Sequence, residues 1–160
     1  GGRRPYGYRG LGEVFVFVFF GLFAVLGTTL TQAGRISATA VCASAAIGFL
    51  ACGILVANNL RDLPADAASG KRTLAVRLGD PATRRLYALL LSGAWIALLP
   101  ILFRHPWAGL TFLALPLSVR PLRAVLGEAR GRALLPVLRD TGRLELAYGV
   151  LLGFSLFLGD

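Results

Sequence analysis

Residues 36–60 read ISATAVCASAAIGFLACGILVANNL, a run of 25 positions without a charged side chain. A helix needs about 20 residues to cross a hydrocarbon core about 30 Å thick, so this run is long enough to span a membrane. Two other uncharged runs are of similar length, with 21 residues over 14–34 and 18 residues over 86–103. The sequence therefore predicts a membrane protein built from helices.

The composition indicates the same class of protein. Of the 160 residues, 56% are hydrophobic and 16% are charged, whereas a soluble domain carries about 25% charged residues and a disordered chain is poor in hydrophobic ones. Two further uncharged stretches, 106–119 and 146–159, have only 14 residues each. They cross a membrane only if the charged side chains beside them extend toward the headgroups, namely Arg120, Arg123, Arg143 and Glu145.

We therefore predict an all-α fold, a multi-span transmembrane helical bundle with about five helices in a single domain over residues 1–160. The predicted spans are residues 12–33, 36–60, 83–103, 106–122 and 143–159. Because the sequence contains no methionine, we expect an N-terminal portion to precede Gly1.

The basic residues predict which loops share a side of the membrane. The net charge is +9, and five alternating spans would place 15 Lys and Arg side chains on one side and only Arg35 and Arg104 on the other. The positive-inside rule then predicts that loops 1–11, 61–82 and 123–142 are cytoplasmic and that the C-terminus is outside. Topology and anionic lipid account for this charge, so we expect no nucleic-acid partner.

One face of the second predicted span carries small side chains. Ala40, Ser44, Gly48 and Cys52 recur every four residues, a spacing that allows another helix to approach closely. An alanine-rich composition would produce the same pattern by accident. Cys42 and Cys52 are about 15 Å apart along such a helix, too far for a disulfide.

The main chemical signal is a polar cluster where the second span is expected to leave the membrane. Asn58, Asp62 and Asp66 follow one another at intervals of four residues, which would place them on one face of an unbroken helix. Pro64 disfavours a helix at this point, so we expect the span to end near Asp62. A short helix would then begin at Pro64 and end at Gly70.

Two explanations for this cluster remain open. The first is that Asp62 and Asp66 form interfacial ion pairs with the basic residues nearby, which are Arg61, Lys71 and Arg72. The second is that they bind Mg²⁺, which takes one or two protein carboxylates together with water and phosphate oxygens. Mg²⁺ and basic side chains at a membrane surface would suit a prenyl diphosphate, which is anionic at one end and apolar at the other.

Two segments resemble a known family. Residues 58–79, NNLRDLPADAASGKRTLAVRLG, resemble the second aspartate-rich segment of the UbiA superfamily of intramembrane prenyltransferases, and within it the menaquinone-pathway branch of dihydroxynaphthoate polyprenyltransferases. Residues 5–21, PYGYRGLGEVFVFVFFG, resemble a cytoplasmic loop and the following helix of the same branch. The two segments occur in the expected order, and a looser resemblance extends to Asp160.

The resemblance implies a function and a set of site residues. Asp62 and Asp66 would be the catalytic, Mg²⁺-binding carboxylates, with Asn58 as a third metal-binding group. The diphosphate would be bound by basic side chains, those of Lys71, Arg72 and Arg61. The implied reaction transfers a polyprenyl group from polyprenyl diphosphate to 1,4-dihydroxy-2-naphthoate with loss of carbon dioxide, giving demethylmenaquinone. The implied location is the plasma (inner) membrane of a bacterium.

Three other side chains are candidates for binding the aromatic acceptor or stabilising an allylic cation. Tyr6 and Tyr8 lie in a predicted cytoplasmic loop, where aromatic faces would attract a cation or simply anchor the chain at the membrane interface. Glu13 begins the first span, where the helix N-terminus by itself favours a carboxylate.

The sequence also departs from the family pattern. The family has two aspartate-rich segments, and this sequence contains one. We expect the other to lie in N-terminal helices missing here, so that this chain is the C-terminal part of a larger bundle and has little activity alone. The alternatives are another UbiA-type aromatic prenyltransferase, or a non-catalytic membrane module for lipid binding or transport.

Overall fold

The computed structural model describes residues 10–127 and 129–159, and this part of the chain consists of helices joined by short connections, without a strand. The predicted all-α fold is confirmed. The segments α1, η2 and α2 run end to end as one rod, which is followed by α3, the short α4 and α5. The bent pair of η3 and α6 comes next, and η4 and α7 form the last rod. Their bounds are α1 Gly12–Val16, π-helical η2 Phe17–Phe23, α2 Ala24–Ala33, α3 Ala38–Ala68, α4 Leu74–Leu78, α5 Asp80–Leu102, 3₁₀-helical η3 Pro106–Ala114, α6 Pro116–Leu126, 3₁₀-helical η4 Gly131–Leu134 and α7 Leu135–Gly159.

The described helices provide four or five candidate spans, where the sequence predicts about five. Four of them are long and apolar enough to cross a membrane, over Gly12–Ala33, Ala38–Ala68, Asp80–Leu102 and Gly131–Gly159. The pair η3 and α6 passes the same test together but is bent by 47°, so that it forms either a fifth, broken span or a re-entrant loop. The helices also extend beyond the predicted spans, because α3 continues to Ala68 and α7 begins at Leu135.

The expected helix break near Asp62 is wrong. Pro64 lies inside α3, which continues to Ala68. Proline removes one backbone hydrogen bond, but tertiary packing often overrides such a local preference, and here Leu60 is buried and Leu63 packs against the core on either side of the break. Gly70 follows the end of the helix with a left-handed φ of 74°, as predicted.

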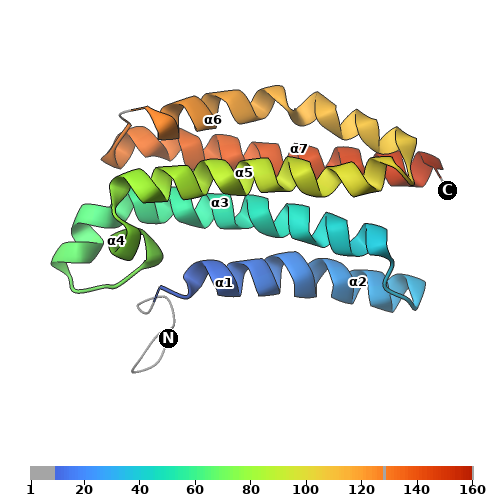
Figure 1. Cartoon of the computed structure of the whole chain (residues 1–160), viewed down its shortest axis with the longest axis horizontal. Coiled ribbons are helices and arrows are strands. Elements are labelled where there is room, and N and C mark those ends of the chain that lie inside the picture. The colour runs from blue at the N-terminus through green and yellow to red at the C-terminus, as the bar shows by residue number, and fades with distance from the viewer. Residues whose placement is uncertain (1–9, 128, 160) are drawn as a thin grey trace.

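The helices form an antiparallel bundle in which the connections collect at two ends (Figure 1). The α4 segment and the connection from α6 to α7 lie at one end. The α2–α3 and α5–η3 connections and the C-terminus lie at the other. Most of the predicted basic loops 61–82 and 123–142 therefore share one end of the molecule, and Arg35 and Arg104 belong to the connections at the opposite end.

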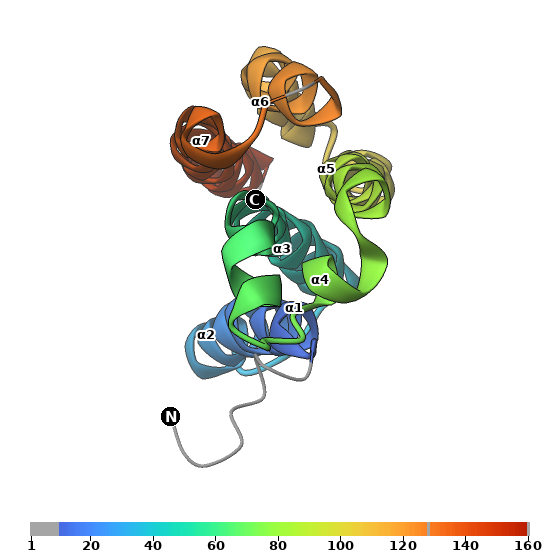
Figure 2. The same ribbon diagram turned by 90° about the vertical axis from the view of Figure 1, so that its left-hand side faces the viewer.

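Helix α3 is the central element. It lies between the α1–α2 rod on one side and α5 and α7 on the other (Figure 2). Two buried tyrosines fasten the second group of helices together. The Tyr87 and Thr141 hydroxyls are 2.6 Å apart, and the Tyr148 hydroxyl donates to the Ala94 carbonyl at 3.0 Å.

The small-residue face of α3 packs against η2, as its spacing predicts. A Cβ atom added to Gly21 would lie only 2.6 Å from the Gly48 Cα atom, and one added to Gly48 would meet the Phe17 ring at 2.8 Å. Ser44 is fully buried. The two backbones therefore approach so closely that only glycine fits at the contact.

Candidate functional site

Because α3 is unbroken, Asn58, Asp62 and Asp66 lie at successive turns on one side of it. Repeats of four residues stay on one face of a helix. Asp66 is buried, whereas the Asp62 side chain is about one-third exposed. The three predicted oxygen donors therefore follow one line along the basic-loop end of α3.

Both carboxylates are paired with neighbouring cations. The Arg61 guanidinium donates to both oxygens of Asp62, at 2.7 and 2.6 Å. The Lys71 ammonium donates to Asp66 Oδ1 at 3.0 Å. Arg72 is exposed. The structure therefore brings the predicted acids together with Arg61 and Lys71, two of the three predicted diphosphate-binding residues.

The donor set suits a divalent cation only in part. Within residues 10–127 and 129–159, no three His, Cys, Asp or Glu side chains are grouped so that they could hold a metal. Two carboxylates and an amide on one face of α3 are hard oxygen donors of the kind that Mg²⁺ takes, and Mg²⁺ usually fills its remaining positions with water and substrate phosphate. Asp62, Asp66 and Asn58 therefore fit as one wall of a magnesium site.

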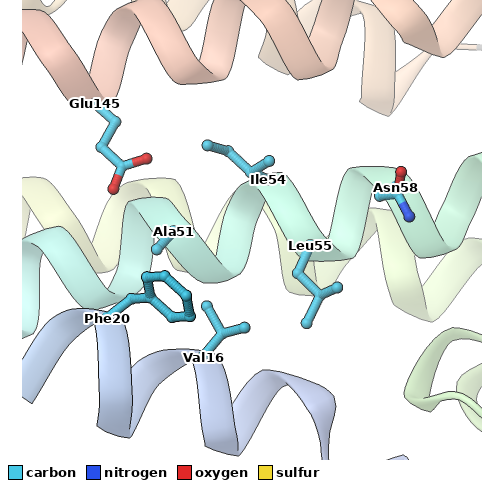
Figure 3. Close-up of a pocket in the computed structure, with 7 residues that line it drawn as sticks. All are labelled: Val16, Phe20, Ala51, Ile54, Leu55, Asn58 and Glu145. Atoms are coloured by element: carbon cyan, nitrogen blue, oxygen red, sulfur yellow. The ribbon is translucent and has the colours of Figure 1, made fainter. Parts of the chain in front are cut away.

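An apolar pocket of about 360 Å³ begins at Asn58, beside the acidic cluster formed by Asp62 and Asp66 (Figure 3). It lies between the α1–η2 rod, α3 and α7, and it is lined by Val16, Phe20, Ala51, Ile54, Leu55, Asn58 and Glu145. Asn58 is at one end of the α3 lining, and Asp62 lies one turn beyond it, about 6 Å further along the helix. A ligand with its polar head at the acids would thus have an apolar volume next to it.

Glu13 is buried at the start of α1. Its Oε1 accepts a hydrogen bond from Asn59 Nδ2 at 2.9 Å, and its backbone carbonyl accepts one from the Cys52 thiol at 3.1 Å. Its Oε2 is also buried and has no hydrogen-bond partner among the described residues. Glu13 thus holds α1 against α3 through Asn59 and Cys52. The other two acceptor candidates, Tyr6 and Tyr8, lie outside the described residues.

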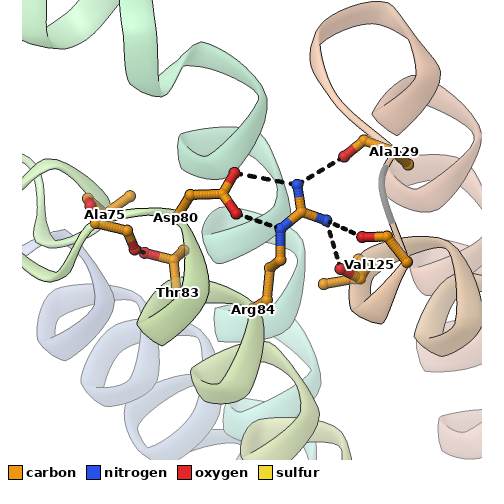
Figure 4. Close-up of polar contacts among 8 residues, drawn as sticks. Ala75, Asp80, Thr83, Arg84, Val125 and Ala129 are labelled. Atoms are coloured by element: carbon orange, nitrogen blue, oxygen red, sulfur yellow. Dashed lines mark hydrogen bonds and ion pairs between the residues drawn. The ribbon is translucent and has the colours of Figure 1, made fainter.

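Arg84, a buried arginine at the same end of the bundle, was not identified from the sequence, where it counts only as one of the 15 basic residues expected on one side of the membrane. Its guanidinium donates to both oxygens of Asp80 and to three backbone carbonyls (Figure 4). The carbonyls belong to Val125, Gly127 and Ala129. Arg84 thus fastens the start of α5 to the connection between α6 and η4. The spacing of Asp80 and Arg84 suggests the ion pair, but nothing local predicts the carbonyls.

Comparison with known proteins identifies relatives over the whole chain. The sequence profile described as the UbiA prenyltransferase family matches residues 4–132. A protein of Mycobacterium tuberculosis named 1,4-dihydroxy-2-naphthoate octaprenyltransferase is 47% identical over 160 residues, which cover 100% of this chain and 55% of that protein. The protein of the same name from Escherichia coli is 40% identical over 162 residues, covering 99% of this chain and 53% of the relative.

A vertebrate relative is more distant. The UbiA prenyltransferase domain-containing protein 1 of Danio rerio is 28% identical over 152 residues, covering 94% of this chain and 44% of that protein. No solved structure matches the chain. The chain spans about half the length of the curated relatives it matches.

Proposed function

The chain belongs to the UbiA prenyltransferase family, and from this we propose that its full-length protein transfers a polyprenyl group from polyprenyl diphosphate to 1,4-dihydroxy-2-naphthoate. The aromatic ring would attack the allylic carbon as diphosphate leaves, and carbon dioxide would be lost to give the hydroquinone form of the demethylmenaquinone ring system. The names of the Mycobacterium tuberculosis and Escherichia coli relatives, at 47% and 40% identity, favour this acceptor within the family.

The proposal rests on one observation, that charged residues and an apolar pocket lie next to each other along α3. Asp62 and Asp66, with their cations, lie toward the end of α3, and the pocket begins one turn away at Asn58. A prenyl diphosphate has the same division, with a charged head and an apolar chain. This arrangement therefore suits this substrate better than it suits a ligand of uniform polarity.

In this proposal the polar residues form a metal-binding group and a diphosphate-binding group. Asp62 and Asp66, with Asn58, would hold a divalent cation, Mg²⁺, which when bound neutralises charge developing on the departing diphosphate. Lys71, Arg72 and Arg61 would bind the diphosphate itself (a basic set of the kind that recognises phosphate oxygens). In the structure, the ion pairs of Arg61 with Asp62 and of Lys71 with Asp66 balance these charges.

The remaining proposals concern the acceptor, the membrane and the rest of the protein. Glu13 would act on the acceptor side through its buried carboxylate, since it already holds Asn59 beside the acidic cluster, and Tyr6 and Tyr8 would offer aromatic faces to the allylic cation. The bundle would lie in the bacterial plasma membrane with its basic loops in the cytoplasm. The relatives extend well beyond the part matched here, and we propose that their additional helices complete the metal site.

Substitution of the two aspartates in the full-length protein tests the function. With Asp62→Asn or Asp66→Asn, prenyl transfer should fall at least about 100-fold, because a carboxylate that would hold the charge-neutralising metal is lost. Asp140→Asn is the matched control, since it removes an acid paired with Arg139 at the same end of the bundle. Equal activity in all three variants would contradict the proposal, and a non-catalytic membrane module would show no transfer in any of them.

A further inference from the structure

Glu145 is the ionisable residue among those that line the pocket. It projects from α7 toward α3, opposite Ala51, with the Phe20 and Val16 side chains on the far side of the pocket (Figure 3). The sequence suggested that Glu145 would extend toward the headgroups. In the structure it lies ten residues into α7 and faces the middle of the uncharged run 36–60.

Glu145 differs from every other acid in the described part of the chain. Glu13 accepts from Asn59, and each described aspartate forms an ion pair, in which the partners of Asp62, Asp66, Asp80 and Asp140 are Arg61, Lys71, Arg84 and Arg139. Neither a hydrogen bond nor an ion pair joins the Glu145 carboxylate to any residue in 10–127 or 129–159. An unpartnered carboxylate within an apolar span is costly, and acids in such positions are typically functional.

The pocket indicates what kind of group would supply the missing partner. Its α3 lining from Ala51 to Asn58 extends about 10 Å along the helix, at 1.5 Å per residue. The walls are apolar, and a half-buried polar side chain stands at each end, with Asn58 toward the basic-loop end of α3 and Glu145 opposite Ala51. This arrangement suits a flat, largely apolar ring with a hydrogen-bond donor at one end.

The charges near the two ends of the pocket determine how the acceptor is oriented in it. A ligand carboxylate would be repelled by Glu145 and attracted toward Asn58 and the cations beyond it, which include Arg61 and Lys71. A phenolic hydroxyl, in contrast, can donate to Glu145. The proposed acceptor carries one carboxylate and two hydroxyls, so it can satisfy both ends of the pocket.

We propose that Glu145 accepts a hydrogen bond from a phenolic hydroxyl of the aromatic acceptor and so fixes the acceptor ring in the pocket between Phe20 and Ile54. This inference rests on the proposed function, because it assumes that an aromatic hydroxy acid is the second substrate. A hydrogen bond to a carboxylate also increases the electron density of the ring, which favours attack on an allylic carbon.

The test uses the full-length protein and steady-state kinetics with each substrate varied in turn. In Glu145→Leu the KM for dihydroxynaphthoate should rise about 10- to 100-fold, the range expected for a hydrogen bond to a charged group. The KM for polyprenyl diphosphate should change less than about twofold. Glu145→Gln should lie between Leu and wild type, because its amide oxygen still accepts a hydrogen bond. Asp140→Asn, the removal of an acid from the same helix outside the pocket, should leave both KM values unchanged.

An acceptor analogue makes the test independent of protein folding. Naphthoates in which one or the other hydroxyl is methylated cannot donate there. With one of the two analogues, wild type should bind as weakly as Glu145→Leu binds dihydroxynaphthoate. Glu145→Leu should bind that analogue no more weakly than it binds dihydroxynaphthoate. The inference is overturned if wild type binds both analogues as tightly as dihydroxynaphthoate.

Other outcomes separate the inference from the proposed function. If wild type transfers to dihydroxynaphthoate and Glu145→Leu has an unchanged acceptor KM, the inference fails and the function stands. A lowered melting temperature with an equal loss for both substrates also overturns it, since Glu145 would then be a structural partner of another part of the protein. If wild type transfers no prenyl group to dihydroxynaphthoate, both fail.

Discussion

Arg84 is the residue whose side chain does most to join distant parts of the chain. Only 7% of its surface is exposed, yet its guanidinium is fully occupied by Asp80 and by the carbonyls of three residues more than 40 positions away. A buried cation is tolerable only with such complete pairing. Its value is therefore structural, in holding the α6–η4 connection at the end of the bundle where the acidic cluster lies.

Replacing Arg84 should therefore destabilise the fold. We expect Arg84→Met to lower the free energy of unfolding by about 3–5 kcal/mol, because Asp80 and the three carbonyls lose their partner. Unfolding of the detergent-solubilised protein, followed by circular dichroism, measures this. Arg85→Met, at the exposed neighbouring position, should change stability by less than about 0.5 kcal/mol. Similar losses in the two variants would show that the network contributes little.

Individual residues also show what the sequence can and cannot reveal. The pairing of Asp62 and Asp66 with nearby cations can be predicted, because these residues are close in sequence and stand out in an acid-poor chain. The carbonyl partners of Arg84 cannot be predicted, since a backbone carbonyl carries no sequence signal. Glu145 was assigned to the membrane surface because it borders an uncharged run, and only the earlier start of α7 at Leu135 places it within the pocket.

Among the elements, the contact of η2 with α3 is the tightest. Gly21 and Gly48 meet with almost no space between the backbones. Gly21→Ala should lower stability by about 1–3 kcal/mol, the usual cost of overpacking. Gly27→Ala is the control on the same rod, since a Cβ atom there would meet nothing within 4 Å, and it should be neutral or slightly stabilising. A neutral Gly21→Ala would mean that the two helices are free to separate.

Helix α3 provides a second test at this scale. Pro64 interrupts the backbone hydrogen bonds of a helix that continues on both sides of it. Pro64→Ala should therefore raise stability, by up to about 3 kcal/mol, because it restores the bond to the Leu60 carbonyl and removes a steric clash. Thermal unfolding is the measurement. A lower melting temperature would show that the proline is needed for the path of the chain toward Gly70.

The sequence predicts most of the helices, but it does not predict that α3 continues through Pro64. Long uncharged runs predicted the helices, because the membrane requires backbone groups to be bonded within each span. The small-residue spacing predicted the close contact at Gly48. The continuation of α3 through Pro64 was not predictable, since the packing of Leu60 and Leu63 on residues far away in sequence outweighs the local preference.

For the molecule as a whole, the described residues provide an acidic wall on α3 and an apolar pocket beside it. Because the carboxylates it contributes are few, we expect residues 1–160 in isolation to show less than about 1% of the transfer rate of the full-length protein under the same conditions. Purified chain and full-length protein in detergent, each with Mg²⁺ and both substrates, give the comparison. Comparable rates would show that this half of the bundle contains the complete site.

We propose that Asp62 and Asp66 serve a metal-dependent transfer of a prenyl group to dihydroxynaphthoate. The most direct measurement is mass spectrometry of the products formed by purified full-length protein from polyprenyl diphosphate and dihydroxynaphthoate, with Mg²⁺ and with EDTA. We expect a decarboxylated, prenylated naphthalene product with Mg²⁺, and almost none with EDTA or in Asp62→Asn. An undiminished yield in EDTA, or no prenylated product in any condition, would contradict it.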